Sequence, residues 1–255
     1  MSLHRVFVDP CDVSGGTVRV NGPSARHMTR VLRMAEGDRF IALDGAGGAW
    51  IAEIRGIDPA GGVTACVTGE SPEWPEPLCR VTLYQSLPKA DKMDLVVQKC
   101  TEVGVKAIVP VLSERSVIRL DGERTSARSA ARVERWRRIA RESAEQSGRR
   151  VIPRIEEITP LESCHPAPGA LFLIMWEAES PDETGVRLKD ALPSERSAAD
   201  VAILVGPEGG LTADEVRRLV SRGAVSVSLG PRILRTETAG MIAAALVLHH
   251  WGDLG

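Results

Sequence analysis

The amino-acid sequence predicts an α/β protein built in two parts, a small β-barrel followed by a larger domain with a doubly wound parallel sheet. Three observations lead to this fold class. Residues 1–70 contain short β-type runs separated by turn residues, strands and amphipathic helices alternate from Leu78 onward, and the segment Ser71–Pro77, with three prolines, divides the two patterns. Because proline continues neither a helix nor a strand ladder, we place the boundary there and expect domains over residues 1–72 and 78–255.

The first domain is predicted from β-type runs of the length that small barrels use. These runs are Arg5–Val8, Thr17–Val20, Arg39–Leu43, Ala49–Ile54 and Val63–Thr68. A helical pattern interrupts them over Ser24–Met34, with Ser24 in the N-cap position. Its apolar residues at helical spacing are Met28, Val31 and Leu32.

The second domain is predicted from strands that alternate with helices, a rhythm typical of a parallel sheet covered on both faces. The expected strands are Arg80–Gln85, Lys106–Val111, Leu171–Trp176, Val201–Val205 and Val225–Leu229. The expected helices are Asp91–Val103, Ser126–Ser147, Thr212–Arg222 and Thr236–His250.

Local signals mark the ends of these helices. Gly104 and Gly223 each follow a last helical residue, where the left-handed conformation is common. Thr212 and Glu215 have the spacing of a capping box at the start of a helix. The apolar face expected for that helix consists of Val216, Leu219 and Val220.

The last helix, Thr236–His250, contains the apolar run Ala243–Leu248. A helix that covers a sheet needs apolar residues on one face only, and this run has more of them than that. We therefore expect a homodimer whose interface contains this helix. The run is too short to cross a bilayer, and charges occupy residues 1–10, where a signal peptide would need an apolar stretch, so we expect a cytoplasmic protein.

Composition excludes several classes of protein. Hydrophobic residues make up 43% and charged residues 26% of the chain, values typical of a globular protein and not of a disordered or collagen-like one. The five cysteines, Cys11, Cys66, Cys79, Cys100 and Cys164, form no Cys-x-x-Cys pair. We therefore expect buried free thiols, no disulfide framework and no metal site.

Charge is distributed unevenly along the chain, although the formal net charge is only −2. Residues 1–77 carry a net charge of −3, residues 78–154 carry +8, and residues 155–255 carry −7. Of the 32 basic residues, 27 are arginine, whose planar guanidinium suits phosphate groups and stacking on bases. The basic middle segment therefore predicts a surface that faces phosphate.

Two glycine-bearing turns follow predicted strands, Leu204–Gly210 and Ser228–Thr238. Ligands of parallel sheets bind at the carboxyl ends of strands, where such turns let backbone amides approach a small molecule. One such turn alone is more often an ordinary connection, but two on neighbouring late strands, one of them holding Arg232 and Arg235, predict a binding pocket. Neither turn matches the dinucleotide or the triphosphate fingerprint.

Other polar clusters favour ordinary structural roles. Glu142 and Glu145 lie on a basic helix, where paired carboxylates are typical of a solvated face. His249 and His250 end a helix, where cations are favoured without a metal, and His27 has no metal-ligating residue at ligand spacing. No G-x-S-x-G motif occurs, which disfavours hydrolases.

Longer motifs occur in a fixed order along nearly the whole chain. They are Tyr84–Lys89, Lys92–Asp94, Gln98–Gly104, Ser113–Ser116, Trp136 with Ala144–Arg149, and both glycine-bearing turns, and in the first domain His27–Met34, Gly37 with Asp38, and Asp44 with Gly45. Together they resemble the RsmE family, the uridine-N3 methyltransferases of 16S ribosomal RNA. Residues 120–128 and 179–200 depart from the family pattern, and we expect variable loops there.

The resemblance implies a fold and a cofactor. The fold is a PUA-like β-barrel followed by a SPOUT methyltransferase domain whose C-terminal segment forms a trefoil knot, acting as a homodimer on S-adenosylmethionine. Three loops hold this cofactor in the family, here the loop after Leu171–Trp176, Gly206–Gly210 and Leu229–Leu234. The cofactor-binding residues expected on this basis are Trp176, Leu204, Gly206, Pro207, Glu208, Gly209, Gly210, Leu229, Gly230, Ile233, Leu234 and Thr238.

The implied reaction places further demands on the protein. Uracil N3 carries a proton and lies on the Watson–Crick edge, so its methylation needs an unpaired base and a way to lose that proton. An arginine near O2 or O4 would stabilise negative charge on the ring, and we expect Arg235 in this catalytic role with Arg232 as second candidate. Contacts to the 16S rRNA of the small ribosomal subunit are expected from Arg5, Arg30, Arg33, Lys89, Lys92, Arg115 and Arg149.

Two alternatives remain open at the level of sequence. The chain could be a non-catalytic RNA-binding protein with a relic pocket, or a SPOUT methyltransferase with another target, such as a tRNA ribose. Binding of S-adenosylmethionine separates an enzyme from a mere binder, and the identity of the methylated nucleoside separates the two enzymes.

Overall fold

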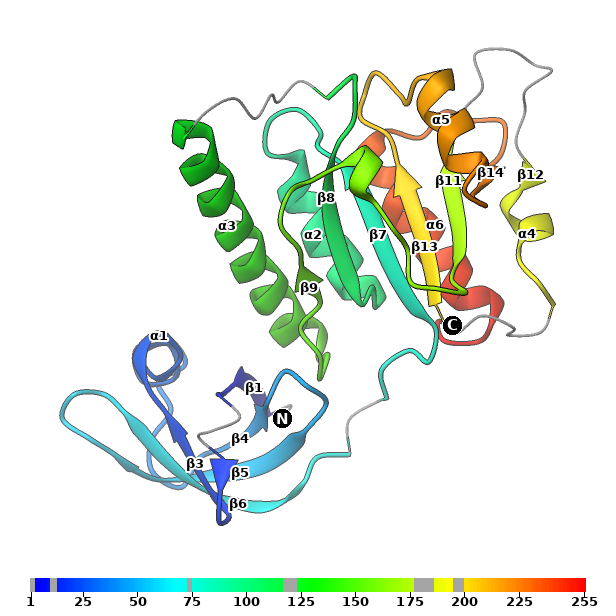
Figure 1. Cartoon of the computed structure of the whole chain (residues 1–255). Helices are drawn as coiled ribbons and strands as arrows, with labels where there is room; N and C mark the ends of the chain where they lie inside the picture. The colour runs from blue at the N-terminus through cyan, green and yellow to red at the C-terminus, as the bar shows by residue number, and fades with distance from the viewer. Residues whose placement is uncertain (1–2, 10–12, 73–74, 117–122, 177–185, 195–199) are drawn as a thin grey trace. The chain divides into compact units, whose positions relative to one another are not determined.

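The computed structural model describes residues 3–9, 13–72, 75–116, 123–176, 186–194 and 200–255 (Figure 1). The chain forms two compact units. The first is Met1–Glu76 together with Ala144–Ile152, and the second is Pro77–Ser143 together with Pro153–Gly255. The chain thus returns to the first unit for one short segment, Ala144–Ile152. The expected domains, residues 1–72 and 78–255, do not include this return.

The first unit is built on a six-stranded sheet in the order β1-β4-β5-β6-β3-β2, curled into a half-barrel (Figure 1). Its strands are β1 (His4–Phe7), β2 (Val13–Ser14), β3 (Thr17–Val20), β4 (Arg39–Leu43), β5 (Ala49–Ile57) and β6 (Val63–Glu70). β1 pairs with β4 in parallel, and the other neighbours pair antiparallel. The expected β-rich first part is therefore confirmed.

Alternating side chains of these strands form the core of the first unit. Val18 and Val20 on β3 and Phe40 and Ala42 on β4 are buried because every second residue of a strand points to the same face. Met28, which is fully buried, contributes from the helical segment.

The helical segment of the first unit differs from the prediction over Ser24–Met34. α1 spans Gly22–Arg26 with Asn21 as N-cap, and a π-helix, η2, spans His27–Val31. Ser24 is therefore not the N-cap; proline at the helix start sets the beginning earlier. In the π-helix the Leu32 N–H bonds the His27 carbonyl, five residues back, which changes the rotation per residue. Val31 consequently turns outward and is 65% exposed, although the helical spacing placed it with Met28.

The second unit contains an eight-stranded sheet in the order β10-β8-β7-β13-β11-β14-β12, with β9 pairing with β8. Its strands are β7 (Arg80–Ser86), β8 (Ala107–Leu112), β9 (Arg154–Ile155), β10 (Thr159–Pro160), β11 (Leu171–Met175), β12 (Val186–Arg187), β13 (Asp200–Val205) and β14 (Val225–Ser228). Every pairing in this sheet is parallel. The predicted parallel sheet is thus confirmed, and the five expected strands form its centre.

Helices cover both faces of this sheet (Figure 1). They are α2 (Lys92–Val103), α3 (Glu123–Ser147), α4 (Leu188–Ala191), α5 (Ala213–Val220) and α6 (Thr236–His250), with a 3₁₀ turn, η3, at Leu161–Ser163. α6 packs against α2, β7 and β13. Gly240 permits this close approach, because a Cβ there would lie 3.1 Å from Leu83 Cδ2. On the opposite face, α5 and η3 pack against side chains such as Tyr84 and Leu204.

The predicted helix ends agree with the structure in two places. Gly104 ends α2 in the left-handed conformation with φ of 114°. The capping box of α5 is formed, since the Glu215 N–H donates to Thr212 Oγ1 and the Thr212 N–H donates to Glu215 Oε2. Val220 was expected to be buried but is 46% exposed, because it is the last residue of α5 and lies beyond the core that takes up Val216.

The apolar run of α6 is explained largely within the chain. Ala243, Ala244, Val247 and Leu248 are buried, because α6 packs against the sheet and also against α2 beside it. Leu246 points outward and is 44% exposed. The excess of apolar residues, which we had attributed to a subunit interface, is therefore mainly the consequence of burial on two sides.

Cys79, Cys100 and Cys164 are buried free thiols and Cys66 is half-buried, whereas Cys11 lies outside the described residues. Burial raises the pKa of the Cys100 thiol to about 12. Among the helices that the structure describes, none combines the length and the apolar character needed to cross a membrane.

Candidate functional site

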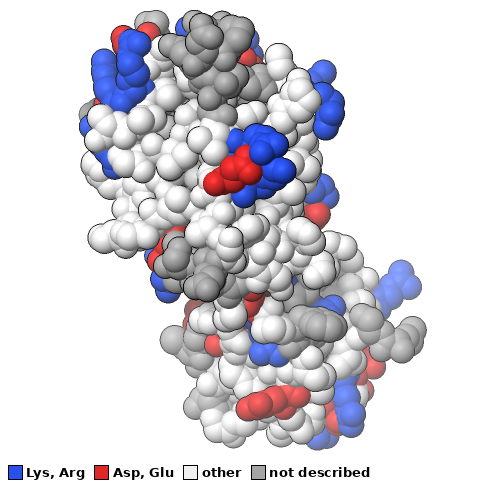
Figure 2. All heavy atoms as spheres, turned by 90° about the vertical axis from the view of Figure 1, so that its right-hand side faces the viewer, with Lys and Arg blue, Asp and Glu red and all other residues white. Residues whose placement is uncertain are grey.

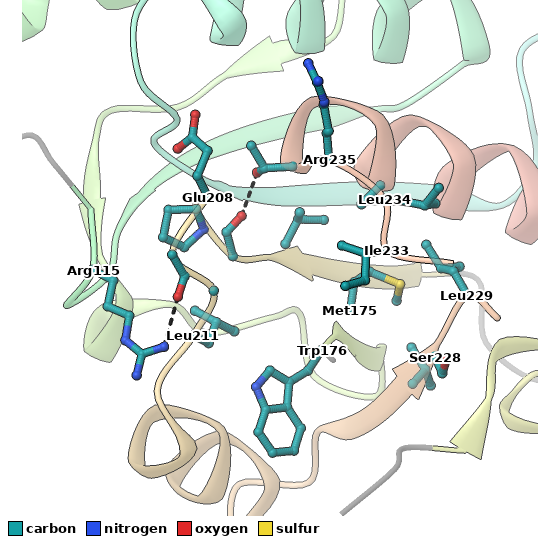
Figure 3. Close-up of a pocket in the computed structure, with 18 of the residues that line it drawn as sticks. Arg115, Met175, Trp176, Glu208, Leu211, Ser228, Leu229, Ile233, Leu234 and Arg235 are labelled. Atoms are coloured by element: carbon teal, nitrogen blue, oxygen red, sulfur yellow. Dashed lines mark hydrogen bonds between the residues drawn. The ribbon is translucent and has the colours of Figure 1, made fainter. Parts of the chain in front are cut away.

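A cavity of about 550 Å³ lies at the carboxyl ends of three neighbouring strands, β13, β11 and β14 (Figure 3). Met175, Val205 and Ser228 are the last residues of these strands, and each lines the cavity. The carboxyl edge of a parallel sheet is where ligands of this fold class bind, and the volume is in the usual range for a small-molecule site.

The glycine-rich loop after β13 forms one wall of the cavity. A Cβ at Gly206 would lie 3.1 Å from the Leu211 backbone nitrogen and 3.2 Å from the Gly210 carbonyl carbon, so a side chain there would press on the backbone of the loop. Gly210 has a φ of 70°, in the left-handed region. The loop therefore presents bare backbone to the cavity.

Two side chains from other elements hold this loop in place. The Arg115 guanidinium donates to the Gly209 carbonyl at 2.9 Å, and the Thr236 hydroxyl donates to the Gly206 carbonyl at 2.6 Å (Figure 3). Thr236 Oγ1 also accepts a hydrogen bond from the fully buried Gln85 amide. The loop is thus fixed at both of its ends.

The second glycine-bearing turn leads from β14 into α6 and forms the opposite wall. Leu229, Ile233 and Leu234 line the cavity, and Ile233 is 83% exposed at its border. Arg235 is the N-cap of α6 and also lines the cavity. Its side chain is 83% exposed and extends from the rim of the cavity (Figure 3).

Lys92 lies between two carboxylates beside the glycine-rich loop. Its Nζ is 3.0 Å from Glu208 Oε1 and 3.2 Å from Glu237 Oε2. The two carboxylates, Glu208 before Glu237, raise the pKa of Lys92. Burial works to raise the pKa of Glu208, but hydrogen bonds from the backbone and from Lys92 outweigh it, and the pKa is lowered. Lysine and glutamate are therefore both charged at neutral pH.

The structure brings most of the predicted cofactor residues together around the cavity. Those that line it are Trp176, Gly206, Pro207, Glu208, Gly209, Gly210, Leu229, Ile233 and Leu234. Leu204 does not, because it is fully buried in the core beneath α5. Gly230, Thr238 and Arg232 also lie outside the lining.

Sequence reasoning missed several lining residues, namely Met175, Val205, Leu211, Val227, Ser228, Thr236 and Ala239. Most of them end a strand or begin the element after a glycine-bearing turn. That position was the available signal, since the carboxyl end of each strand in a parallel sheet contributes to the same edge.

The residues predicted to contact RNA have different surroundings. Arg30, Arg33 and Lys89 are exposed. Arg149 differs from the prediction: its side chain is 8% exposed, and Nη2 and Nε donate to Glu76 Oε2 at 2.7 and 3.1 Å. Arg149 is therefore a structural ion pair of the first unit and does not present its guanidinium to phosphate.

Arg5 is half-buried and packs beside Gly148, and a Cβ at that glycine would lie 3.2 Å from Arg5 Nε. Lys92 and Arg115 are engaged at the cavity, as described above. On the face shown in Figure 2, lysine and arginine form small separate groups, several beside Asp or Glu, with uncharged surface between them. The described part of this face therefore offers no continuous basic surface.

With two family-model matches, the curled β-sheet unit, the parallel sheet and the cavity at its carboxyl edge define the class of protein, an RNA methyltransferase that carries a PUA domain. Residues 75–248 match the model of the RNA methyltransferase domain, and residues 20–61 match that of the RNA methyltransferase PUA domain.

The chain belongs to the ribosomal RNA small subunit methyltransferase E family, as its motifs indicated. It is 32% identical over 235 residues to the family member from Bacillus subtilis, covering 91% of this chain and 89% of the relative. It is 33% identical to the Synechocystis member, covering 96% of this chain and 77% of the relative.

Solved structures agree with this assignment. Ribosomal RNA small subunit methyltransferase E from Neisseria gonorrhoeae, solved with S-adenosylmethionine, superposes with a TM-score of 0.85 at 30% identity over 100% of both chains. A methyltransferase from Legionella pneumophila, also solved with this cofactor, gives a TM-score of 0.83 at 26% identity over 100% of both chains.

Proposed function

We propose that this chain methylates N3 of a specific uridine in 16S ribosomal RNA and uses S-adenosylmethionine as the methyl donor. The observation that carries the proposal is the cavity at the carboxyl ends of β13, β11 and β14, bounded by a backbone cradle and by Arg235 at its rim. Membership of the family supports the RNA substrate.

The residues of the cavity fit S-adenosylmethionine. Leu229, Ile233 and Leu234 offer apolar surface for an adenine ring, and the loop from Gly206 to Gly210 offers backbone groups for polar parts of the molecule. The absence of a side chain at Gly206 lets the loop turn tightly on itself, because a Cβ there would meet the backbone of Gly210 and Leu211. When bound, the cofactor supplies an electrophilic methyl group attached to a sulfonium.

Arg235 is proposed as the catalytic residue that acts on the target base. Among the described residues, the acidic group nearest to its guanidinium is Glu237, whose Oε1 lies 4.0 Å from Nη1. This long contact leaves N–H donors for a uracil oxygen or a flanking phosphate. A donor at O2 or O4 stabilises the negative charge that develops as the N3 proton is lost. Arg232, exposed on the same turn, is the second candidate.

RNA contacts are proposed for the basic residues that remain accessible. Exposure favours Lys89 in the second unit and Arg30 and Arg33 in the first. Arg5 and Arg115 are retained as lesser contributors, because each is already packed against or bonded to the protein. The substrate is the RNA itself or the small ribosomal subunit.

We further infer a cytoplasmic homodimer that packs through α6, and a trefoil knot in the C-terminal segment. Exposed Leu246 supports the dimer, because its side chain points away from the core of its own chain. The adjacency of β13, β11 and β14 supports the knot, because the three cofactor loops of the family follow strands that are neighbours here.

Two measurements test the function. Calorimetry with S-adenosylmethionine should show binding to the full chain, and nucleoside mass spectrometry of total RNA from a deletion strain should show loss of 3-methyluridine from the 16S rRNA fraction. Absence of cofactor binding would favour a non-catalytic RNA-binding protein. Loss of a different methylated nucleoside, from transfer RNA for example, would favour another target.

A further inference from the structure

Lys92, in the first turn of α2, connects two elements that border the cavity. One is the glycine-rich loop, through Glu208 Oε1 at 3.0 Å from Nζ, and the other is the first turn of α6, through Glu237 Oε2 at 3.2 Å. The side chains of Lys92, Glu208 and Glu237 are 33%, 25% and 11% exposed. An ammonium is a compact charge with three donors, so it can hold two carboxylates at the same time.

A neutral contact joins the same two elements. Thr236, which lies between Arg235 and Glu237, donates from Oγ1 to the Gly206 carbonyl. The loop and α6 are therefore linked at one point by a hydroxyl and at a second point by the charge of Lys92. Both links hold the start of α6, and Arg235 is the N-cap residue there.

We propose that Lys92 is a positioning residue for methyl transfer, which sets the glycine-rich loop through Glu208 and the start of α6, with Arg235, through Glu237. The inference rests on the proposed function and adds a residue to its site. Without the ammonium, two partly buried carboxylates would lose their shared counterion at the border of the cavity. Glu208 would keep the Lys89 backbone N–H, and Glu237 would keep the Arg235 guanidinium at 4.0 Å. The charge that holds the two carboxylates together would be gone, so their repulsion would move the loop and the helix end apart.

This role differs from the phosphate contact that the sequence suggested for Lys92. A lysine whose charge is already shared between two carboxylates does not neutralise an RNA phosphate, and so it releases none of the cations condensed on the RNA. Removing Lys92 should therefore change cofactor binding and catalysis, and leave the salt dependence of RNA binding unchanged.

Lys99 provides a matched control on the same helix. Its Nζ is 2.9 Å from Glu102 Oε1 in an i,i+3 pair within α2, and neither residue lines the cavity. Lys99→Met thus removes one lysine and one ion pair from α2 without touching the loop or α6.

The test uses the full chain and two readouts: S-adenosylmethionine affinity by calorimetry, and the single-turnover methylation rate on small ribosomal subunits at saturating cofactor. Lys92→Met should lower each by about tenfold or more, since small displacements of reacting groups have effects of this size. Glu208→Gln should lower mainly the affinity, and Glu237→Gln mainly the rate. Lys92→Arg should restore part of both losses, and Lys99→Met should match the wild type.

Double variants decide whether Lys92 acts through its two partners. Lys92→Met combined with Glu208→Gln should bind the cofactor no more weakly than Lys92→Met alone. Lys92→Met combined with Glu237→Gln should react no more slowly than Lys92→Met alone. Independent losses that add in both pairs would overturn the proposal, as would a fall of about one unit in the log–log salt slope of RNA binding for Lys92→Met.

Thermal unfolding of each variant separates positioning from loss of fold. If Lys92→Met does not fold, Lys92→Arg and the two glutamine variants still test the proposal. The proposal fails unless Glu208→Gln lowers mainly the cofactor affinity and Glu237→Gln lowers mainly the methylation rate. A wild-type chain that binds cofactor but methylates no RNA would contradict the proposed function. In that case the cofactor affinities of the Lys92 and Glu208 variants would still show whether Lys92 positions the glycine-rich loop.

Discussion

Arg149 and Lys92 both belong to the basic segment of residues 78–154, and each is held by carboxylates of its own chain. Lys89 and Arg235, by contrast, are exposed. Burial explains the difference, because a charge that leaves water needs a partner of opposite sign. At the scale of single residues, the surroundings decide whether a basic side chain stabilises the protein or is available to a substrate.

Gly206 is the residue whose replacement should most directly close the cofactor site. Gly206→Val should abolish measurable binding of S-adenosylmethionine in calorimetry, because its Cβ would lie 3.1 Å from the Leu211 backbone nitrogen, which cannot move aside without moving the loop. Gly209→Val should weaken binding less, since there the Cβ meets the movable Arg115 side chain at 3.3 Å.

Gly69→Ala is the control for these variants. No atom lies within 4 Å of a Cβ at Gly69, and its φ is not in the left-handed region. Full cofactor affinity in a folded Gly206→Val protein would contradict the assignment of the pocket.

Arg235 is expected to act on the chemical step. Arg235→Ala should leave S-adenosylmethionine affinity within a few-fold and lower the single-turnover rate by on the order of a hundredfold or more, the usual effect of removing one charge-stabilising donor. Arg235→Lys should recover part of the rate, because lysine keeps the charge and loses the planar fork.

The opposite pattern would change the assignment. If Arg235→Ala loses cofactor affinity and keeps its rate at saturating cofactor, Arg235 belongs to the binding loop. The catalytic role would then pass to Arg232 or to a residue of a second subunit.

At the scale of elements, α6 combines three tasks along its length. Its start borders the cavity with Arg235 and Thr236, its middle packs against both the sheet and α2, and Leu246 remains on its outer side. Gly240 belongs to the middle part, where a side chain would press on Leu83. One helix thus connects the proposed site with the proposed subunit interface.

The dimer proposal predicts the effect of a charge at Leu246. Leu246→Glu would place two carboxylates near each other across an isologous interface and should yield monomers in sedimentation at micromolar concentration. Val220→Glu is the control, since Val220 is 46% exposed on α5, which covers the other face of the sheet. A wild-type chain that sediments as a monomer would refute the proposed interface.

At the scale of the whole molecule, the chain has two folded units of different character, a curled and mostly antiparallel sheet and a parallel sheet covered by helices. Each unit carries exposed basic residues, Arg30 and Arg33 in the first and Lys89 in the second. We therefore assign RNA affinity to both units.

This assignment predicts a steep dependence of RNA affinity on salt. Lys89→Ala and Arg30→Ala should each lower the log–log slope by about one unit, because each true phosphate contact releases condensed counterions. Arg149→Ala should instead lower the stability of the first unit, because it leaves Glu76 without its buried partner. Binding that does not respond to salt, or full binding by residues 1–77 alone, would contradict the assignment.

Much of the fold could be predicted because its signals are local. Short β-type runs between turn residues marked the strands of the first unit, and the rhythm of strands and helices marked those of the second. Gly104 and the capping box of Thr212 marked helix ends. The two glycine-bearing turns located the cavity, since turns after parallel strands meet at one edge of the sheet. Family motifs added the class of reaction, which no local pattern contains.

The sequence by itself therefore determined the class of fold, the order of its elements and the place of the site. Only the tertiary structure decided that Lys92 lies between Glu208 and Glu237, that Arg149 is buried against Glu76, and that α6 is covered on two sides. The physical reason is that burial and ion pairing depend on residues far apart in the chain. Helical or strand periodicity shows which residues share a face, and packing decides what that face meets.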